Sequence, residues 1–104
     1  MNSIRIKDDD VLECPYCPDK AESYLHHGRV MVYERHEDEP KVKKTEVSKG
    51  TAFTSEIDNN GSGNPSFRRN GLAICFECEF CGRTSELTIA QHKGQCLLAW
   101  RGTE

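Results

Sequence analysis

Two Cys-x-x-Cys pairs are the residues of this sequence whose type and spacing could bind a metal ion. Cys14 and Cys17 form the first pair, and Cys78 and Cys81 form the second. The spacing lets a tight turn direct two sulfur atoms at one ion, and two such turns supply the four thiolates of a structural zinc site. Gly82 follows the second pair and favours a tight turn, because glycine takes positive φ without steric cost. The sequence therefore predicts one structural Zn²⁺ bound by these four cysteines.

Two further cysteines, Cys75 and Cys96, have a simpler interpretation. Each lies in an apolar stretch that is typical of a strand, where a free cysteine packs as a small hydrophobic residue. Two alternatives stay open at this point. Cys75 and Cys78 are also spaced as a metal pair, and His92 with Cys96 offers two residue types that bind zinc.

Composition limits the class of protein. The chain has 104 residues, enough for a single domain over 1–104, and only 36% of them are hydrophobic. A core this small is often supplemented by a metal ion. The first ten residues have no apolar run, so we expect a flexible arm over 1–10 and no signal peptide. No stretch approaches the roughly 20 apolar residues that a membrane helix needs, and the paired Cys-x-x-Cys motifs favour a cytoplasmic protein. The formal net charge of −3 argues against nucleic-acid binding driven by bulk charge.

The strand pattern predicts a mostly β fold. Apolar and β-branched residues recur in short runs that are separated by turn residues, and no amphipathic helix is expected. The expected strands are 24–35, 42–47 as a possible edge strand, 51–57 as its extension or replacement, 71–78, 84–91 and 96–101. Lys93 and Gly94 are expected to turn a hairpin over 84–101. Residues 58–66 are small and polar, which predicts a flexible loop.

Period-two alternation predicts which side chains of the last strands point inward. In the strand 71–78 the large apolar residues share one face with Cys78, and Cys75 lies on the opposite face. The side chains expected to point inward are Leu72, Ile74, Phe76, Leu87 and Ile89.

The two cysteine pairs and the strand residues beside them resemble the knuckles of zinc-ribbon proteins. In that family the knuckles lie at the ends of β-hairpins and hold one structural zinc. The resemblance implies a small zinc-ribbon-like antiparallel β domain with an inserted strand and loop region over 18–77, which is long for a minimal ribbon. The segments 64–72 and 85–94 also resemble small uncharacterised bacterial and phage proteins, a resemblance that implies no activity.

A partner site is predicted where the 58–66 loop enters the strand 71–78. Arg68 and Arg69 lie there, and arginine forks match phosphates and carboxylates. His26 and Arg29 are possible neighbours. The partner is expected to be a protein or a nucleic acid.

Enzyme motifs are absent from the sequence: it has no phosphate-binding glycine loop, no Gly-x-Ser-x-Gly and no His-Glu-x-x-His. The favoured interpretation is a monomeric, zinc-stabilised binding or adaptor module without catalytic residues. The alternative is a small metal-dependent or thiol-redox enzyme that uses His26, His27, His92 or the additional cysteines. A redox role would need an exposed Cys-x-x-Cys with a lowered thiol pKa and no metal.

Overall fold

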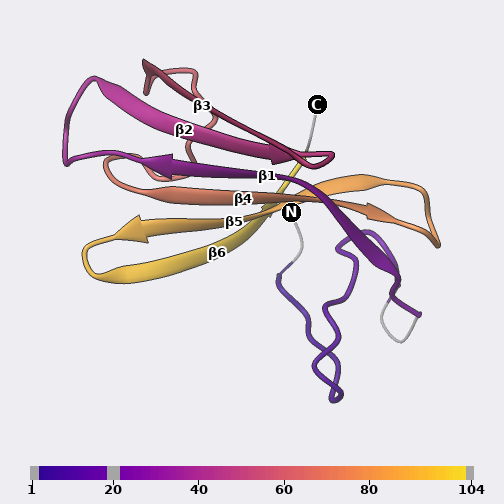
Figure 1. Ribbon diagram of the computed structural model, residues 1–104. Coiled ribbons are helices and arrows are strands. Elements are labelled where there is room, and N and C mark those ends of the chain that lie inside the picture. The colour runs from indigo at the N-terminus through magenta and orange to yellow at the C-terminus, as the bar shows by residue number, and fades with distance from the viewer. Residues whose placement is uncertain (1–2, 19–21, 103–104) are drawn as a thin grey trace.

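The structure is a computed structural model that describes residues 3–18 and 22–102. Its described residues form one six-stranded antiparallel sheet and no helix (Figure 1), which confirms the predicted mostly β class. The strands are β1 (Leu25–Glu34), β2 (Lys41–Ser48), β3 (Thr51–Asp58), β4 (Gly71–Cys78), β5 (Thr84–His92) and β6 (Gln95–Arg101). Their order across the sheet is β3-β2-β1-β4-β5-β6. Among the described residues, no helix is long and apolar enough to cross a membrane.

Tight turns join the two outer pairs of strands. The β5–β6 hairpin turns at Lys93 and Gly94, with φ of 47° and 81°, as predicted. Lys49 and Gly50 take the same left-handed conformation between β2 and β3. Because β3 pairs with β2 along its whole length, β3 forms the edge of the sheet and β2 lies inside it. The expectation that 42–47 forms the edge is therefore wrong.

One face of the sheet carries the main apolar cluster. Met31, Tyr33, Val42 and Ala73 are fully buried there, and Cys75 packs against them. We call this side the loop-covered face. The prediction that Leu72, Ile74 and Phe76 occupy the buried side of β4 is wrong, because these three side chains are only half-buried on the opposite face.

The loop before β4 covers this apolar cluster. A side chain at Gly63 would begin 3.0 Å from the Tyr33 hydroxyl, so the loop backbone packs closely against the hydroxyl end of that side chain. The Asn64 amide donates to the Asn59 side chain and to the Arg69 carbonyl oxygen, both at 2.9 Å. The Ser66 hydroxyl donates to the Gln91 carbonyl oxygen at 2.8 Å. The segment is thus hydrogen-bonded within itself and to β5, and the flexibility expected for 58–66 stays a prediction.

The opposite side, which we call the open face, carries apolar side chains that run across the sheet in register. Val32 on β1 pairs with Leu72 on β4, Leu72 with Ile89 on β5, and Ile89 with Leu98 on β6. Directly paired residues place their side chains on the same face. Val32 and Leu98 at the two ends of this stripe are exposed.

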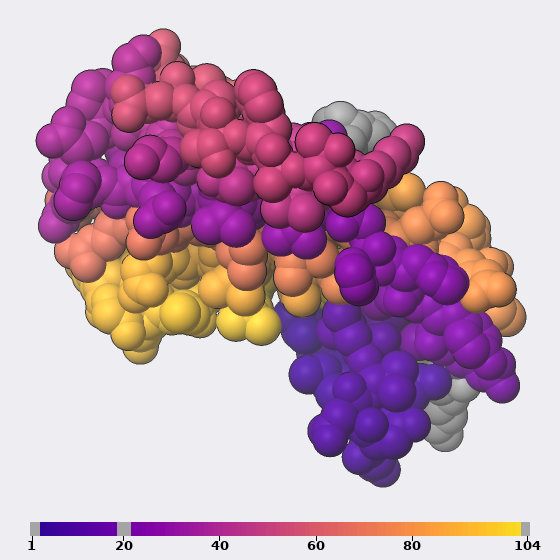
Figure 2. All heavy atoms as spheres, viewed as in Figure 1, coloured from indigo at the N-terminus to yellow at the C-terminus, as the bar shows by residue number. Residues whose placement is uncertain are grey.

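The N-terminal segment, residues 3–18, lies beside one end of the sheet (Figures 1 and 2). A short antiparallel bridge between Ile6 and Leu12 folds it back on itself. Its cysteines belong to a second buried cluster, separate from the main one, which consists of Cys14, Cys17 and Cys78 with Leu25 packed against them. This second cluster is the part of the core that contains the predicted metal site.

Candidate metal centre

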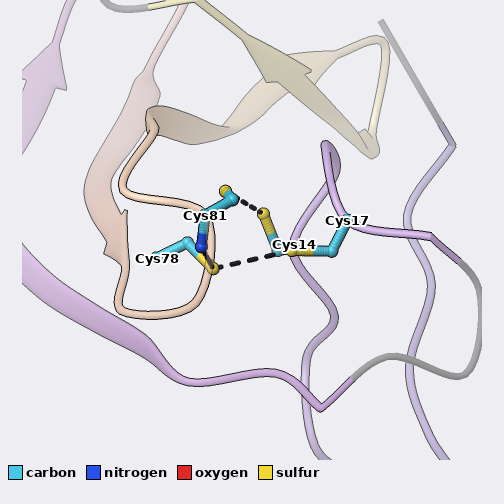
Figure 3. A group of neighbouring side chains, drawn as sticks. All are labelled: Cys14, Cys17, Cys78 and Cys81. Atoms are coloured by element: carbon cyan, nitrogen blue, oxygen red, sulfur yellow. Dashed lines mark hydrogen bonds between the residues drawn. The ribbon is translucent and has the colours of Figure 1, made fainter.

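Four cysteine side chains from distant parts of the sequence meet at the end of the sheet (Figure 3). The sulfur atoms of Cys14, Cys17, Cys78 and Cys81 all lie within 4.8 Å of one another. The Sγ atoms of Cys14 and Cys81 are 3.8 Å apart, and those of Cys17 and Cys78 are 3.7 Å apart. The fold therefore brings together the four residues that the sequence predicted as one site.

These separations fit a metal ion and do not fit disulfides. A tetrahedral ion with metal–sulfur bonds of about 2.3 Å holds its sulfurs about 3.8 Å apart. A disulfide would hold two sulfurs at about 2.05 Å, whereas all four cysteines are free thiols. Four thiolates at tetrahedral corners are typical of zinc and of iron bound by cysteine. The residues present thus match the donor set and the spacing of a closed four-cysteine metal site.

The second knuckle is a backbone turn that joins β4 to β5. Gly82 donates its N–H to the Cys78 carbonyl oxygen at 2.8 Å, and Cys78 donates to the Arg83 carbonyl oxygen at 3.0 Å. Gly82 has a φ of 75°, which confirms why glycine stands at this position. The Cys81 N–H points at the Cys78 sulfur at 3.5 Å. This turn holds both sulfurs of the pair on one side and gives one of them a backbone donor.

Arg5 holds the first knuckle in place. Its guanidinium donates to the carbonyl oxygens of Cys14 at 2.9 Å and Cys17 at 2.8 Å, so one side chain bridges both ends of the knuckle. Arg5 also lies 3.8 Å from the Glu13 carboxylate. Sequence reasoning missed this role, because residues 1–10 have the composition of a solvated arm and nothing local pairs Arg5 with the cysteines.

A cation–π contact connects the two knuckles. The Arg83 guanidinium lies 5.0 Å from the ring centre of Tyr16, which is the residue between the first two cysteines. The Tyr16 N–H in turn points at the Cys14 sulfur at 3.4 Å. Such a contact contributes about 0.5–1 kcal/mol at a partly exposed site. Arg83 is a second residue that sequence reasoning missed, since no spacing rule relates it to Tyr16.

The thiols have unequal proton affinities in the metal-free cluster. Burial raises the pKa of Cys14, and burial together with the neighbouring thiols raises the pKa of Cys17 to about 12. Burial also acts to raise the pKa of Cys78, but the backbone N–H groups of Cys81 and Phe80 outweigh it and lower that pKa to about 7. Four thiolates this close together repel one another. A bound metal ion would offset that repulsion, because its charge favours the ionised form of each sulfur.

The other candidate ligands lie elsewhere. Cys75 is half-buried and lies 3.6 Å from the Glu86 carboxylate, as expected for a strand cysteine on the face opposite Cys78. Cys96 is exposed on the edge strand β6, so the expectation that it packs as a small hydrophobic residue is wrong. Neither Cys75 nor His92 belongs to the group of metal-binding side chains formed by the described residues.

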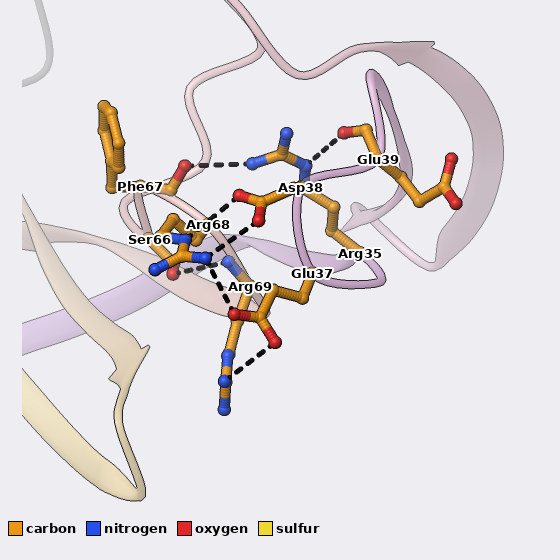
Figure 4. Close-up of polar contacts among 8 residues, drawn as sticks. All are labelled: Arg35, Glu37, Asp38, Glu39, Ser66, Phe67, Arg68 and Arg69. Carbon is orange, nitrogen blue, oxygen red and sulfur yellow. Dashed lines mark hydrogen bonds and ion pairs between the residues drawn. The ribbon is translucent and has the colours of Figure 1, made fainter.

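The predicted partner residues separate into two places. Arg68 and Arg69 meet the turn after β1 (Figure 4), where Arg68 pairs with Glu37 and Asp38 at 2.8 Å and Arg69 pairs with Glu37 at 3.0 Å. His26 lies near the other end of β1.

At that end of β1, His26 pairs with Glu79 at 2.9 Å, beside the second knuckle. A strand rises about 3.3 Å per residue, so His26 and the turn after Glu34 are separated by about 26 Å. Arg29 lies beside Cys75 on the loop-covered side of the sheet, and its pKa is raised by a hydrogen bond to the Cys75 sulfur. The structure therefore brings Arg68 and Arg69 together but does not bring His26 to them.

No family model, curated protein or solved structure matches this chain. The metal site is supported by the geometry of the four cysteines in this chain. The zinc-ribbon resemblance is limited to the two cysteine pairs and the strand residues beside them.

Proposed function

We propose that this protein is a structural zinc module, in which one Zn²⁺ bound by the four cysteines fastens the N-terminal segment to the β4–β5 turn. The observation that carries the proposal is the sulfur spacing, 3.7 and 3.8 Å across the two knuckles, which equals the edge of a tetrahedral zinc–thiolate site. The ion would stabilise the second cluster, which has little apolar packing of its own. That cluster contains three buried cysteines and few other apolar side chains.

A structural role fits this site better than a catalytic one. Catalytic zinc sites keep one coordination position for water or substrate, whereas four protein thiolates fill a tetrahedral ion. Cys14, Cys17 and Cys78 are buried, so three of the four ligands have little contact with solvent. Such an ion stabilises the fold and leaves no position for a reacting molecule.

Burial also argues against the thiol-redox alternative. A redox Cys-x-x-Cys needs an accessible thiolate as its nucleophile. Cys78, the thiol with the lowered pKa, is only 1% exposed, and its exposed neighbour Cys81 lies beside Cys14 as well as Cys78. The four sulfurs are arranged as one group of four, which favours a shared ion over two separate redox pairs.

We further propose that the module acts by binding a partner, through a surface at Arg68, Arg69 and the adjoining 58–66 loop. Each guanidinium is already hydrogen-bonded to a carboxylate, and these pairs are exposed. A partner that offers carboxylates or phosphates would exchange with Glu37 and Asp38 at modest cost, because exposed ion pairs contribute little stability. With a net charge of −3, the protein as a whole favours a protein partner over a nucleic acid.

The metal proposal is tested by the metal content of the purified protein. We expect one zinc per chain, and removal by a strong chelator is expected to abolish the dispersed NMR signals of the knuckle residues. A metal-free protein with the same spectrum would exclude a structural role.

The partner proposal is tested separately, by titrating labelled oligonucleotides at two salt concentrations. Phosphate contacts make affinity fall steeply with salt, so wild-type protein that shows no binding at low salt excludes a nucleic-acid partner. A double variant, Arg68→Ala with Arg69→Ala, that binds as well as the wild type would place the site elsewhere.

A further inference from the structure

Strand β6 forms an edge of the sheet that lacks the usual protection against pairing over its first five residues, whereas Trp100 near its end is buried. It is the last strand in the sheet order, and β5 is the only strand of the described residues that it contacts. Its sequence, QCLLAWR, contains no proline and no acidic residue, and its first five residues are exposed. Edge strands normally avoid pairing through charges, proline, bulges or covering segments. Here the only charged side chain is Arg101 at the end of the strand.

The turn before β6 determines which backbone groups face outward. A two-residue turn with positive φ at both Lys93 and Gly94 makes His92 and Gln95 the hydrogen-bonded closing pair. Hydrogen-bonded and outward positions then alternate along the strand. The N–H and C=O groups of Cys96, Leu98 and Trp100 therefore point away from β5. Among the described residues, no turn or loop pairs with these backbone groups.

The side chains of β6 fit the same edge. Leu98 is 51% exposed and ends the apolar stripe of the open face, which runs from Val32 through Leu72 and Ile89. A strand added beside β6 would extend this stripe and would cover Leu98. The edge therefore offers unpaired backbone groups and an apolar side chain at the same position.

We propose that β6 pairs with β6 of a second copy of the chain, antiparallel about a two-fold axis at Leu98. Leu98 of one copy then faces Leu98 of the other, Cys96 faces Trp100, and Gln95 faces Arg101. This register uses all seven residues of the strand and about six main-chain hydrogen bonds, formed by the outward groups alone. No like charges face each other in it, and the apolar stripes of the two copies become continuous.

The opposite edge explains why the pairing stops at two copies. Two-fold pairing uses both β6 edges and leaves β3 at each end of the joined sheet. The second half of β3 carries Glu56 and Asp58, charged residues of the kind that discourage edge pairing. An edge contact buries less than the roughly 800 Å² per partner of a stable interface, so we expect a dissociation constant of about micromolar order.

Sedimentation of the full, zinc-loaded chain over a concentration series tests the proposal. The wild type is expected to shift from one to two chain masses as its concentration rises. Leu98→Lys places two like charges at the two-fold axis and is expected to weaken dimerisation at least about tenfold. Leu97→Lys is the matched control, because Leu97 is similarly exposed, at 48%, but lies on the other face of the sheet with Ala90. In the proposed register it would face Ala99 of the second copy. This control is expected to dimerise as the wild type does.

A second pair of variants tests the register, in a Cys96→Ser background. Leu98→Cys brings two sulfurs together at the axis and is expected to give a disulfide-linked dimer on mild oxidation. Leu97→Cys leaves its two copies about 8 Å apart, too far for a disulfide. Equal cross-linking of the two variants would overturn the register.

Three sedimentation results would overturn the proposal itself. A wild type that stays at one chain mass up to about 1 mM would exclude pairing between copies, and any strand added at β6 would then come from a different protein. Assemblies larger than two chains would exclude closed two-fold pairing. Loss of the dimer in Val32→Lys, a change on the open face far from β6, would mean that the sheets stack face to face instead.

Discussion

At the residue scale, Cys75 and Cys78 lie three positions apart on β4 but have different surroundings. The sulfur of Cys78 lies among three other cysteines, whereas Cys75 faces Glu86 on the other side of the strand. We expect Cys78→Ser or Cys81→Ser to lose the zinc, because each removes a ligand. Cys75→Ser removes only a packing thiol, so it is expected to keep the zinc and cost about 1 kcal/mol of unfolding free energy. Metal content by mass spectrometry checks both results.

Cys96→Ser is a second control for this series, because Cys96 is exposed on β6 and belongs to no group of ligands. If Cys75→Ser lost its zinc while Cys81→Ser kept it, the second pair of ligands would be Cys75 and Cys78. That outcome would contradict the site described above.

Arg5 also acts at the residue scale, through the carbonyl oxygens of Cys14 and Cys17. Hydrogen bonds to a charged group contribute about 1.5–3 kcal/mol each at most when they are well shielded, and the Arg5 side chain is partly exposed. We expect Arg5→Met to release zinc to a competing chelator about tenfold faster, with one zinc per chain still bound beforehand. Arg35→Met is a matched control, since Arg35 also bonds carbonyl oxygens but does so at the other end of the sheet. Equal release rates in wild type and Arg5→Met would contradict this role.

At the element scale, the start of β4 accepts no side chain larger than hydrogen. A Cβ at Gly71 would overlap the Asn64 side chain and lie 2.7 Å from Pro65, so the covering loop would have to move. We expect Gly71→Ala to lower the unfolding free energy by about 1–3 kcal/mol in chemical denaturation. Gly28→Ala is the control, because nothing lies within 4 Å of its Cβ position, and its effect should be under about 1 kcal/mol. Similar losses in both variants would show that the loop does not pack on Gly71.

The ion pair between the loop and the turn after β1 predicts a pH effect. Arg68 donates to the Asp38 carboxylate and lowers the pKa of Asp38 below its ordinary value. The folded pKa is therefore below the unfolded value of about 3.9, so the pair stabilises the fold above that pH. This contribution is lost as the pH falls through the folded pKa. Arg68→Gln is expected to raise the pKa of Asp38 toward the ordinary value in an NMR titration, and an unchanged pKa would contradict the pairing.

Local patterns predicted most strands but not which face of the sheet is buried. Lys93 and Gly94 form the expected turn because a two-residue hairpin demands left-handed backbone, which is a purely local requirement. The choice between Ala73 and Leu72 as the core side of β4 is not local, since both faces of this strand are apolar. It depends on which face the 58–66 loop covers, a contact that alternation along one strand does not encode.

The candidate site also has one part that local sequence predicts and one part that it does not. The four cysteines follow from spacing, because Cys-x-x-Cys fixes two ligands within one turn. Arg5 and Arg83 complete the site through contacts between segments far apart in the chain, and no motif relates them to the cysteines. The whole-chain assignment to a single domain over 1–104 stays a prediction.

At the scale of the whole molecule, the described residues form two separate buried clusters, one under the loop and one at the cysteines. We expect chelation to remove hydrogen-exchange protection first from residues 12–17 and 76–83, because the proposed metal ion would hold these segments together. The pairs between β1 and β2 are expected to keep their protection longer, since Tyr33 and Val42 pack without the ion. Hydrogen exchange followed by mass spectrometry measures this order. Simultaneous loss at both ends would show that the metal supports the whole fold as one unit.

The coordination of zinc in the purified protein is the most direct test of the four-cysteine site. X-ray absorption spectroscopy at the zinc edge reports the type, number and distance of the ligands. Four sulfur ligands at about 2.3 Å, with no nitrogen or oxygen ligand, are the result predicted by the sulfur spacing of 3.7 and 3.8 Å. Zinc bound by fewer than four sulfurs, or a folded protein that binds no zinc at all, would contradict the proposal that these cysteines form a closed structural site.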